Sequence, residues 1–273
     1  MASNPKLAQG ARWPTADLLA LAAAGVLLLV FFLRHGAGNH FYAALGITIA
    51  FAAVGRVARG VDTSGALAGG VIALILATEN VKLFWVLLAV FLITLAATKV
   101  GGNRKKQLLV AEADHGRSAA QVMSNLYIGT LMLARPLQMT TEIAVLLLLA
   151  ALAEVAADTS SSEIGTAYPG KTVLITTWKS VPAGENGGIS AAGTLAGIVA
   201  AALVAGCASA LGVVSFSIAA VVVLAGTLGM LIDSVLGAAL ERKGRLGNNS
   251  VNLLGTVAAA GIAYAIQYVV LSN

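Results

Sequence analysis

Long apolar runs alternate with short polar segments along almost the whole chain. A helix needs about 20 apolar residues to cross a hydrocarbon core of about 30 Å, so each run is a candidate membrane span. The nine runs cover residues 16–33, 41–58, 64–78, 82–98, 118–134, 141–157, 190–213, 215–237 and 250–271. We therefore predict an all-α polytopic transmembrane bundle of about nine spans, within a range of seven to nine.

Two of these runs differ from the others. The run at 64–78 is short and glycine-rich, which leaves a re-entrant or broken helix as an alternative there. The run at 118–134 carries Gln121, Ser124 and Asn125, so we expect it to face other helices rather than lipid.

Composition supports the membrane interpretation. The 273 residues are 58% hydrophobic and 11% charged, whereas soluble domains carry about 25% charged residues. The mean hydropathy is +0.88. The 30 glycines would let transmembrane helices approach closely. The single cysteine, Cys207, lies in an apolar run and predicts neither a disulfide nor a metal site. No cleavable signal is expected, because the first run is long enough to span.

The distribution of basic residues predicts the orientation of the bundle. With the N-terminus inside, 14 of the 17 Lys and Arg residues fall in inside segments, and only Arg34, Lys82 and Arg135 fall outside. The positive-inside rule therefore predicts that the N-terminus lies on the cytoplasmic side of a bacterial inner membrane, or on the corresponding side of a plastid membrane. The net charge of +5 is not read as a sign of nucleic-acid binding.

Three large polar loops lie at 99–117, 158–189 and 238–249. Two predicted spans separate each loop from the next, so all three are expected on the same face of the membrane. Topology alone explains much of their basic charge. It does not explain the acidic residues at the span ends or the glycines beside them, and we expect a phosphate-handling site there.

The first acidic group lies at the end of the sixth run. Glu154 and Asp158 are four residues apart, so on a helix they share a face. Asp158 opens the sequence Asp-Thr-Ser-Ser-Ser-Glu-Ile-Gly165, which includes Glu163. Carboxylate and hydroxyl oxygens are the ligands that Mg²⁺ prefers. We predict a metal or substrate role for these acids, and helix termination with hydroxyl capping is the alternative.

The second acidic group ends the eighth run. Asp233 lies in an otherwise apolar segment, with Gly229, Gly237 and Glu241 on its face at offsets of four. An ionisable residue within a span is a functional candidate, and the alternative is a structural salt bridge.

A glycine loop lies between the two acidic groups. The sequence Val181-Pro-Ala-Gly-Glu-Asn-Gly-Gly-Ile-Ser190 leads into the seventh run, where Gly187, Gly188 and Ser190 could present backbone N–H groups to an anion. The alternative is a flexible turn with Ser190 as helix cap. Lys171 and Lys179 flank the loop and could reach phosphates.

Further candidates lie on the first and third loops. Positive charge for an anion site comes from Lys99, Lys105, Lys106 and Arg117. His115 is interpreted as a solvent-exposed loop residue. The amides could bind a nucleotide or hold helices together, and the sequence favours neither reading; they are Gln121, Asn125, Asn248, Asn249 and Asn252. Acids, glycine loop and lysines together are typical of Mg²⁺-assisted phosphoryl or nucleotidyl transfer.

Five segments carry a family resemblance: Glu112–Asn125, the run ending at Gly165, residues 175–190, Gly229–Gly237 and Asn248–Thr256. In this order they resemble an integral membrane family, defined as a domain of uncharacterised function, that includes the plant and cyanobacterial phytyl-phosphate kinases. The resemblance covers about residues 60–270. It divides the single membrane domain, 1–273, into N-terminal spans at 1–60 and a family-like catalytic core at 61–273.

The resemblance implies transfer of the terminal phosphate of a nucleoside triphosphate, CTP favoured, onto an isoprenyl monophosphate such as phytyl or geranylgeranyl phosphate. It implies that Mg²⁺ is held by Asp158, Glu163 and Asp233 and that Lys99, Arg117 and Lys171 hold phosphates. The implied partners are the lipid substrate, a nucleotide and the bilayer; a homo-oligomer is left open.

A weaker likeness, of residues 177–188 and 229–242, is to the membrane CTP-dependent cytidylyltransferases. Such an enzyme would attach the nucleotide to the lipid phosphate and release pyrophosphate. A third reading is an ion-coupled transporter, in which the intramembrane acids and the glycine-rich third run would form a site at mid-bilayer.

Overall fold

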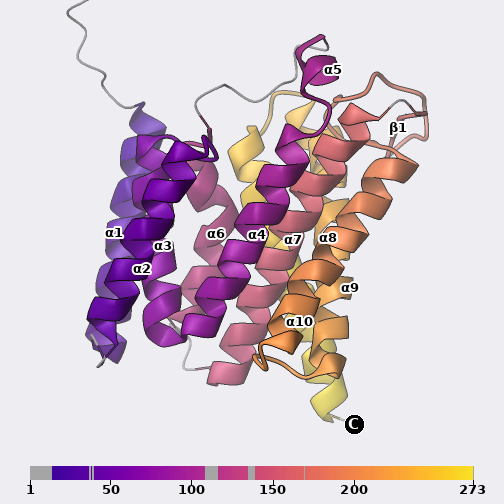
Figure 1. The fold of residues 1–273 in the computed structure, drawn as a ribbon. Coiled ribbons are helices and arrows are strands. Elements are labelled where there is room, and N and C mark those ends of the chain that lie inside the picture. The colour runs from indigo at the N-terminus through magenta and orange to yellow at the C-terminus, as the bar shows by residue number, and fades with distance from the viewer. Residues whose placement is uncertain are drawn as a thin grey trace, which may run out of the picture.

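The computed structural model describes residues 14–36, 38, 40–107, 116–134, 139–168 and 170–272. Nine helices of 15 or more residues lie within these ranges and form one bundle (Figure 1). They are α1 (Thr15–His35), α2 (Phe41–Val57), α3 (Thr63–Glu79), α4 (Val81–Lys99), α6 (Ala119–Leu133), α7 (Thr141–Ala167), α8 (Ala191–Ala210), α9 (Phe216–Leu236) and α10 (Asn248–Ser272).

Each of the nine predicted spans coincides with one of these helices, so the predicted all-α polytopic fold is confirmed. Six of them are long and apolar enough to cross a membrane by themselves: α1, α4, α7, α8, α9 with its extension to Glu241, and α10. Helices α2 and α3 are shorter, with 17 residues each. Helix α3 is continuous, so the broken-helix alternative does not apply. The inside location of the N-terminus stays a prediction.

Helix α7 is the central element of the bundle. Its 27 residues are apolar on all sides along most of their length, as expected of a helix enclosed by others. It packs against α4, α6, α8, α9 and α10. Helices α1, α2 and α3 lie on the far side of α6 from α8 and α9 (Figure 1). Residues on α7 can therefore lie close to residues of several neighbouring helices.

The end of α7 differs from the sequence prediction. The apolar run stops at residue 157, where we placed the start of a loop, but the helix continues to Ala167. Asp158 and Glu163 therefore project from a helix rather than from a loop. The reason is tertiary packing: α8 covers this polar extension, because Gly193 and Gly197 let its backbone approach the carbonyls of Ser161 and Ala157.

Shorter elements gather at the end of the bundle where α7 finishes. They are α5 (Gly102–Gln107), the two-stranded antiparallel pair β1 (Val173–Leu174) and β2 (Gly188–Ile189), and the π-helical turn η2 (Gly237–Glu241) that extends α9. Figure 1 shows α5 and β1 at this same end. The sharing of one face by the three polar loops is thus observed. Lys6, Arg12, Arg135 and His115 lie outside the described residues.

Candidate functional site

Two adjoining polar cavities open at this end of the bundle. One, of about 110 Å³, lies between the ends of α7 and α9, the start of α10 and the loop before α8. The other, of about 120 Å³, lies between α6, α7 and the start of α10. Both are lined by Asp158, Ser162, Asn248 and Asn252, so they adjoin, and we call the two together the polar basin.

The carboxylates of the basin come from α7, from α9 with its extension η2, and from Glu185 in the loop before α8. Asp158 on α7 lines both cavities, whereas Asp233 on α9 and Glu241 on η2 line the first. The charges of Asp158, Asp233 and Glu241 interact. The helical extension of α7 also places Ser161 and Ser162 in the lining of the first cavity. The basin thus presents carboxylate and hydroxyl oxygens together, the donor set of a hard cation such as Mg²⁺.

Glu154 lies one turn deeper than Asp158 and is enclosed by the bundle. Its side chain is 1% exposed, and neither carboxylate oxygen has a hydrogen-bond partner among the described residues. A side chain placed at Gly255 of α10 would overlap Glu154 and touch Asp233, so the two acids approach each other across this glycine. An isolated buried acid is costly. Glu154 therefore remains a candidate for the functional region, although it lines neither cavity.

Glu163 faces the second cavity and is held by a cation. Its carboxylate forms an ion pair with Lys105 of α5, and both side chains are largely buried. The Lys105 ammonium also donates to the carbonyls of Ala97 (3.2 Å) and Thr98 (3.0 Å) at the end of α4. Lys105 therefore joins α4, α5 and α7. The predicted metal role of Glu163 stays a prediction.

The three acids predicted to share one metal ion are not gathered at one point. Among the described residues, no group of three or more His, Cys, Asp or Glu side chains is placed to hold a metal ion. Asp158 and Asp233 share the first cavity, while Glu163 lines the second. Mg²⁺ commonly uses only one or two carboxylates and completes its coordination with water and substrate phosphates. The donor set of the first cavity fits that pattern.

The glycine loop lies against the basin, but some of its backbone N–H and carbonyl groups already form hydrogen bonds within the protein. The Gly188 N–H donates to the Glu185 carbonyl (2.8 Å), and the Gly187 carbonyl accepts from the N–H of Ile175 (3.0 Å). Gly187 has a left-handed backbone, φ +77°, and any side chain on it would overlap Ala238. We conclude that Gly187 allows close approach to η2, a role that the sequence did not reveal.

Ser190 and Glu185 fix the two ends of this loop region. Ser190 caps α8 by accepting from the Gly193 N–H (3.2 Å), as the capping alternative predicted, and it also lines the basin. Glu185 pairs with Arg242 at 2.6 Å between Oε1 and Nε, which fastens the loop to the segment after η2. The loop thus forms a rigid wall of the first cavity.

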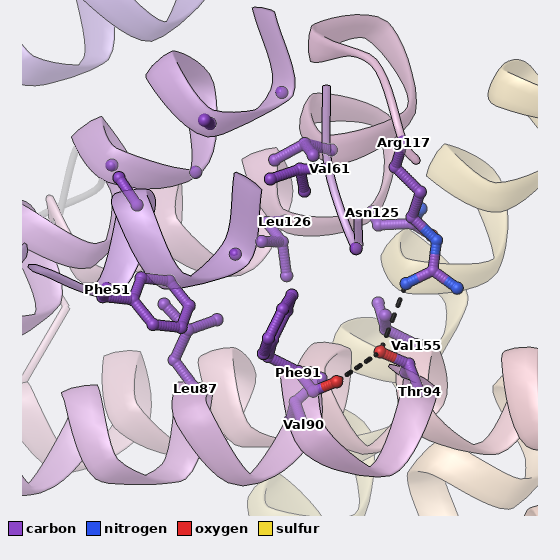
Figure 2. Close-up of a pocket in the computed structure, with 18 residues that line it drawn as sticks. Phe51, Val61, Leu87, Val90, Phe91, Thr94, Arg117, Asn125, Leu126 and Val155 are labelled. Carbon is purple, nitrogen blue, oxygen red and sulfur yellow. Dashed lines mark hydrogen bonds between the residues drawn. The ribbon is translucent and has the colours of Figure 1, made fainter. Parts of the chain in front are cut away.

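Arg117 lies at the side of the second cavity, in a position set by the chain around it. Its guanidinium donates to Thr94 Oγ1 at 3.2 Å, as Figure 2 shows. It also donates to Thr98 Oγ1 at 3.5 Å, and both threonines belong to α4. Its backbone N–H donates to the Gly60 carbonyl (3.1 Å), and its carbonyl accepts from the Asp62 N–H (3.0 Å). These contacts place a cation beside Asp158, with which its charge interacts.

The connection between α2 and α3 was missed by sequence reasoning. Asp62 caps α3 by accepting from the Gly65 N–H, and Ser64 accepts from the N–H of Ala119 at the start of α6. The sequence Asp62-Thr-Ser-Gly65 is a readable capping signal at the start of an apolar run. Its contact with residue 117, more than fifty positions later, carries no local signal.

The remaining predicted residues divide into two groups. Asn125 lines the second cavity, and its amide donates to the Gln121 carbonyl (2.8 Å); Asn252 lines both cavities. Neither cavity is lined by the other four predicted residues, which are Lys99, Lys171, Lys179 and Asn249. The three lysines are exposed. Asn248, one position before Asn249, lines both cavities instead.

Fold and site together define a multi-pass integral membrane protein whose acidic and amide side chains converge in a basin at one end of the bundle. Residues 46–260 match the family described as Integral membrane protein DUF92. This match covers well over half of the chain, and the protein belongs to that family.

Individual relatives extend this finding. The chain is 30% identical to Protein VTE6, chloroplastic, of Arabidopsis thaliana over 287 aligned residues, which cover 99% of this chain and 85% of that protein. It is 32% identical to the uncharacterized membrane protein sll0875 of Synechocystis, with 67% and 73% of the two chains covered. For Protein PGR of Arabidopsis thaliana the identity is 31%, with 68% and 74% covered. No solved structure matches the chain.

Proposed function

We propose that this protein is a phosphotransferase that moves the terminal phosphate of a nucleoside triphosphate, with CTP favoured, onto an isoprenyl monophosphate such as phytyl or geranylgeranyl phosphate. The observation that carries the proposal is the polar basin. It has carboxylates and hydroxyls on one side, an arginine on the other, and Asp158 between them. The family resemblance to phytyl-phosphate kinases supports the substrate class.

The proposed reaction needs positioning and charge neutralisation more than acid–base catalysis. An oxygen of the acceptor phosphate attacks the γ-phosphorus of the nucleotide and forms a new P–O bond. The bond from the γ-phosphorus to the β–γ bridging oxygen breaks, and the nucleoside diphosphate leaves with that electron pair. The acceptor phosphate is already an anion at neutral pH, so no strong general base is required.

The basin supplies the groups that this reaction needs. Arg117 would hold negative charge on the acceptor phosphate and on the phosphoryl group during transfer. Asp158 and Asp233, with the hydroxyls of Ser161 and Ser162, would hold Mg²⁺, which when bound neutralises the nucleotide phosphates. Asn248 and Asn252 line both halves of the basin and could donate hydrogen bonds to the nucleotide.

The test is a labelling experiment with the purified, detergent-solubilised protein. It is incubated with Mg²⁺, phytyl monophosphate and CTP labelled on either the α- or the γ-phosphate. We expect the γ-label on the lipid as phytyl diphosphate. An α-label on the lipid would instead identify a cytidylyltransferase. No labelled lipid with any nucleoside triphosphate, over a range of isoprenyl monophosphates, would refute phosphate transfer and favour transport.

A further inference from the structure

A third cavity adjoins the polar basin, and it is almost entirely apolar. It lies between α2, α3, α4 and α6 and encloses about 70 Å³. Figure 2 shows Arg117 and Thr94 at one end of it and the rings and aliphatic groups of Phe51 and Leu87 at the other. The Phe51 ring contacts the rings of Phe91 and Phe84, with centroids 5.4 and 5.5 Å apart. We call this space the apolar cavity.

The apolar cavity and the polar basin share two lining residues. Arg117 and Asn125 line both the apolar cavity and the second polar cavity. The guanidinium is held there by Thr94, which is 2% exposed and lines the apolar cavity. The junction therefore presents a fixed positive charge on one side and an apolar space on the other. This is the complement of an anionic head group joined to a hydrocarbon chain.

We propose that the apolar cavity binds the isoprene unit next to the acceptor phosphate, while Arg117 binds that phosphate. The proposal rests on the proposed function and assigns a place to each end of the acceptor. The phosphate at Arg117 faces Asp158 across the second polar cavity. The nucleotide phosphates then lie at the first cavity, where Asp233 and the glycine loop lie.

The size of the apolar cavity sets how much of the chain it holds. Its 70 Å³ is about half of the roughly 150 Å³ that accommodates one benzene ring in a protein interior. From Thr94 to Leu87 the cavity follows seven residues of α4, or about 10 Å along the helix axis. A five-carbon unit is about as large as a benzene ring, so this space takes only part of one unit, and a twenty-carbon chain does not fit. The remaining units must lie outside it, against lipid.

This arrangement predicts where the protein discriminates between acceptors. Phytyl and geranylgeranyl phosphate share the first isoprene unit and differ only in the saturation of later units. We expect them to compete for binding within about twofold of each other, since later units do not touch the cavity. A preference of more than about tenfold would show that the protein reads later units and would overturn the proposal.

The direct test is photo-crosslinking without nucleotide. The purified protein is mixed with an isoprenyl monophosphate that carries a diazirine on its first unit, and labelled peptides are mapped by mass spectrometry. Label on α3 and α4 at the cavity, including Phe91, is expected. Label confined to exposed outer surfaces of the bundle would overturn the proposal.

A matched pair of variants tests occupancy. Gly69 lines the apolar cavity, and a Cβ there would only touch Val122 at 3.9 Å, so the longer Gly69→Leu side chain fills the cavity. Gly206 of α8 is exposed with nothing within 4 Å of a Cβ, so Gly206→Leu adds the same group outside. We expect Gly69→Leu to lower cavity labelling at least about tenfold and Gly206→Leu to leave it unchanged.

Failure of this inference can be told apart from failure of the proposed function. Because the crosslinking needs no turnover, labelling of the cavity without any phosphate transfer would retain the acceptor site and reject the phosphotransferase. Phosphate transfer together with wild-type labelling in Gly69→Leu would retain the phosphotransferase and reject the acceptor site. A graded variant, Gly69→Ala, adds only an ordinary van der Waals contact and keeps the test informative if the leucine variant does not fold.

Discussion

Replacing Lys105 by methionine removes the cation that pairs with Glu163 at the end of α7. The two side chains are 3% and 14% exposed, so the pair is largely screened from water. Removing one partner of a buried pair costs about 3–5 kcal/mol, because the other charge is left uncompensated. Glu163 keeps some contact with solvent, so we expect the lower end, about 3 kcal/mol.

The assay is thermal unfolding of the solubilised protein in a double-mutant cycle. At about 2 °C per kcal/mol for a chain of this size, Lys105→Met should lower Tm by about 6 °C. Glu163→Gln should also destabilise, and the double variant should be less destabilised than the sum by at least about 1 kcal/mol. Effects that add within about 0.5 kcal/mol would refute the reading of this pair as a structural link.

The same cycle decides the role of Glu163 in the proposed reaction. If Glu163 only fastens α7 to α5, the Glu163→Gln variant keeps its Mg²⁺ requirement when assayed well below its Tm. A rise of tenfold or more in the Mg²⁺ concentration needed for half-maximal activity would instead show that Glu163 helps to hold the metal ion.

Two further predictions each compare a variant with a matched control variant. Asn252 lines both polar cavities and Asn249 lines neither among the described residues, so Asn252→Ala should weaken nucleotide binding about tenfold, measured by equilibrium binding, while Asn249→Ala should not. Equal losses in the two variants would contradict this placement. Gly187→Ala should lower stability by about 1–3 kcal/mol more than Gly244→Ala, since both have positive φ but only the former would overlap a neighbour, Ala238. Equal melting temperatures would refute the close approach.

The fold could be predicted from the sequence because hydrocarbon imposes a simple requirement. A span must be apolar over about 20 residues, and every predicted run became a helix. The end of α7 was predicted wrongly for a related reason. Hydropathy stops at residue 157, but the helix continues under the cover of α8, and that cover depends on glycines in another segment.

The candidate site was predictable in part. Asp158 and Asp233 stand out because a carboxylate near hydrocarbon is rare, and the structure brings both to one cavity. The predicted phosphate-binding lysines, Lys99, Lys171 and Lys179, were predicted from their charge and their position in the sequence. Neither property determines where an exposed side chain points. Lys105 and the Gly60–Asp62 segment gain their importance from contacts with distant residues, which local patterns do not record.

The most direct test of a reaction centred on the polar basin compares phosphate transfer by the wild type, Asp158→Asn and Glu142→Gln. Both substitutions remove one carboxylate charge from α7, but Glu142 is exposed at the opposite end of that helix. With γ-labelled CTP and phytyl monophosphate, Asp158→Asn should lose at least about 100-fold in kcat with unchanged Tm, and Glu142→Gln should match wild type. Wild-type turnover in Asp158→Asn would contradict a reaction centred on the polar basin.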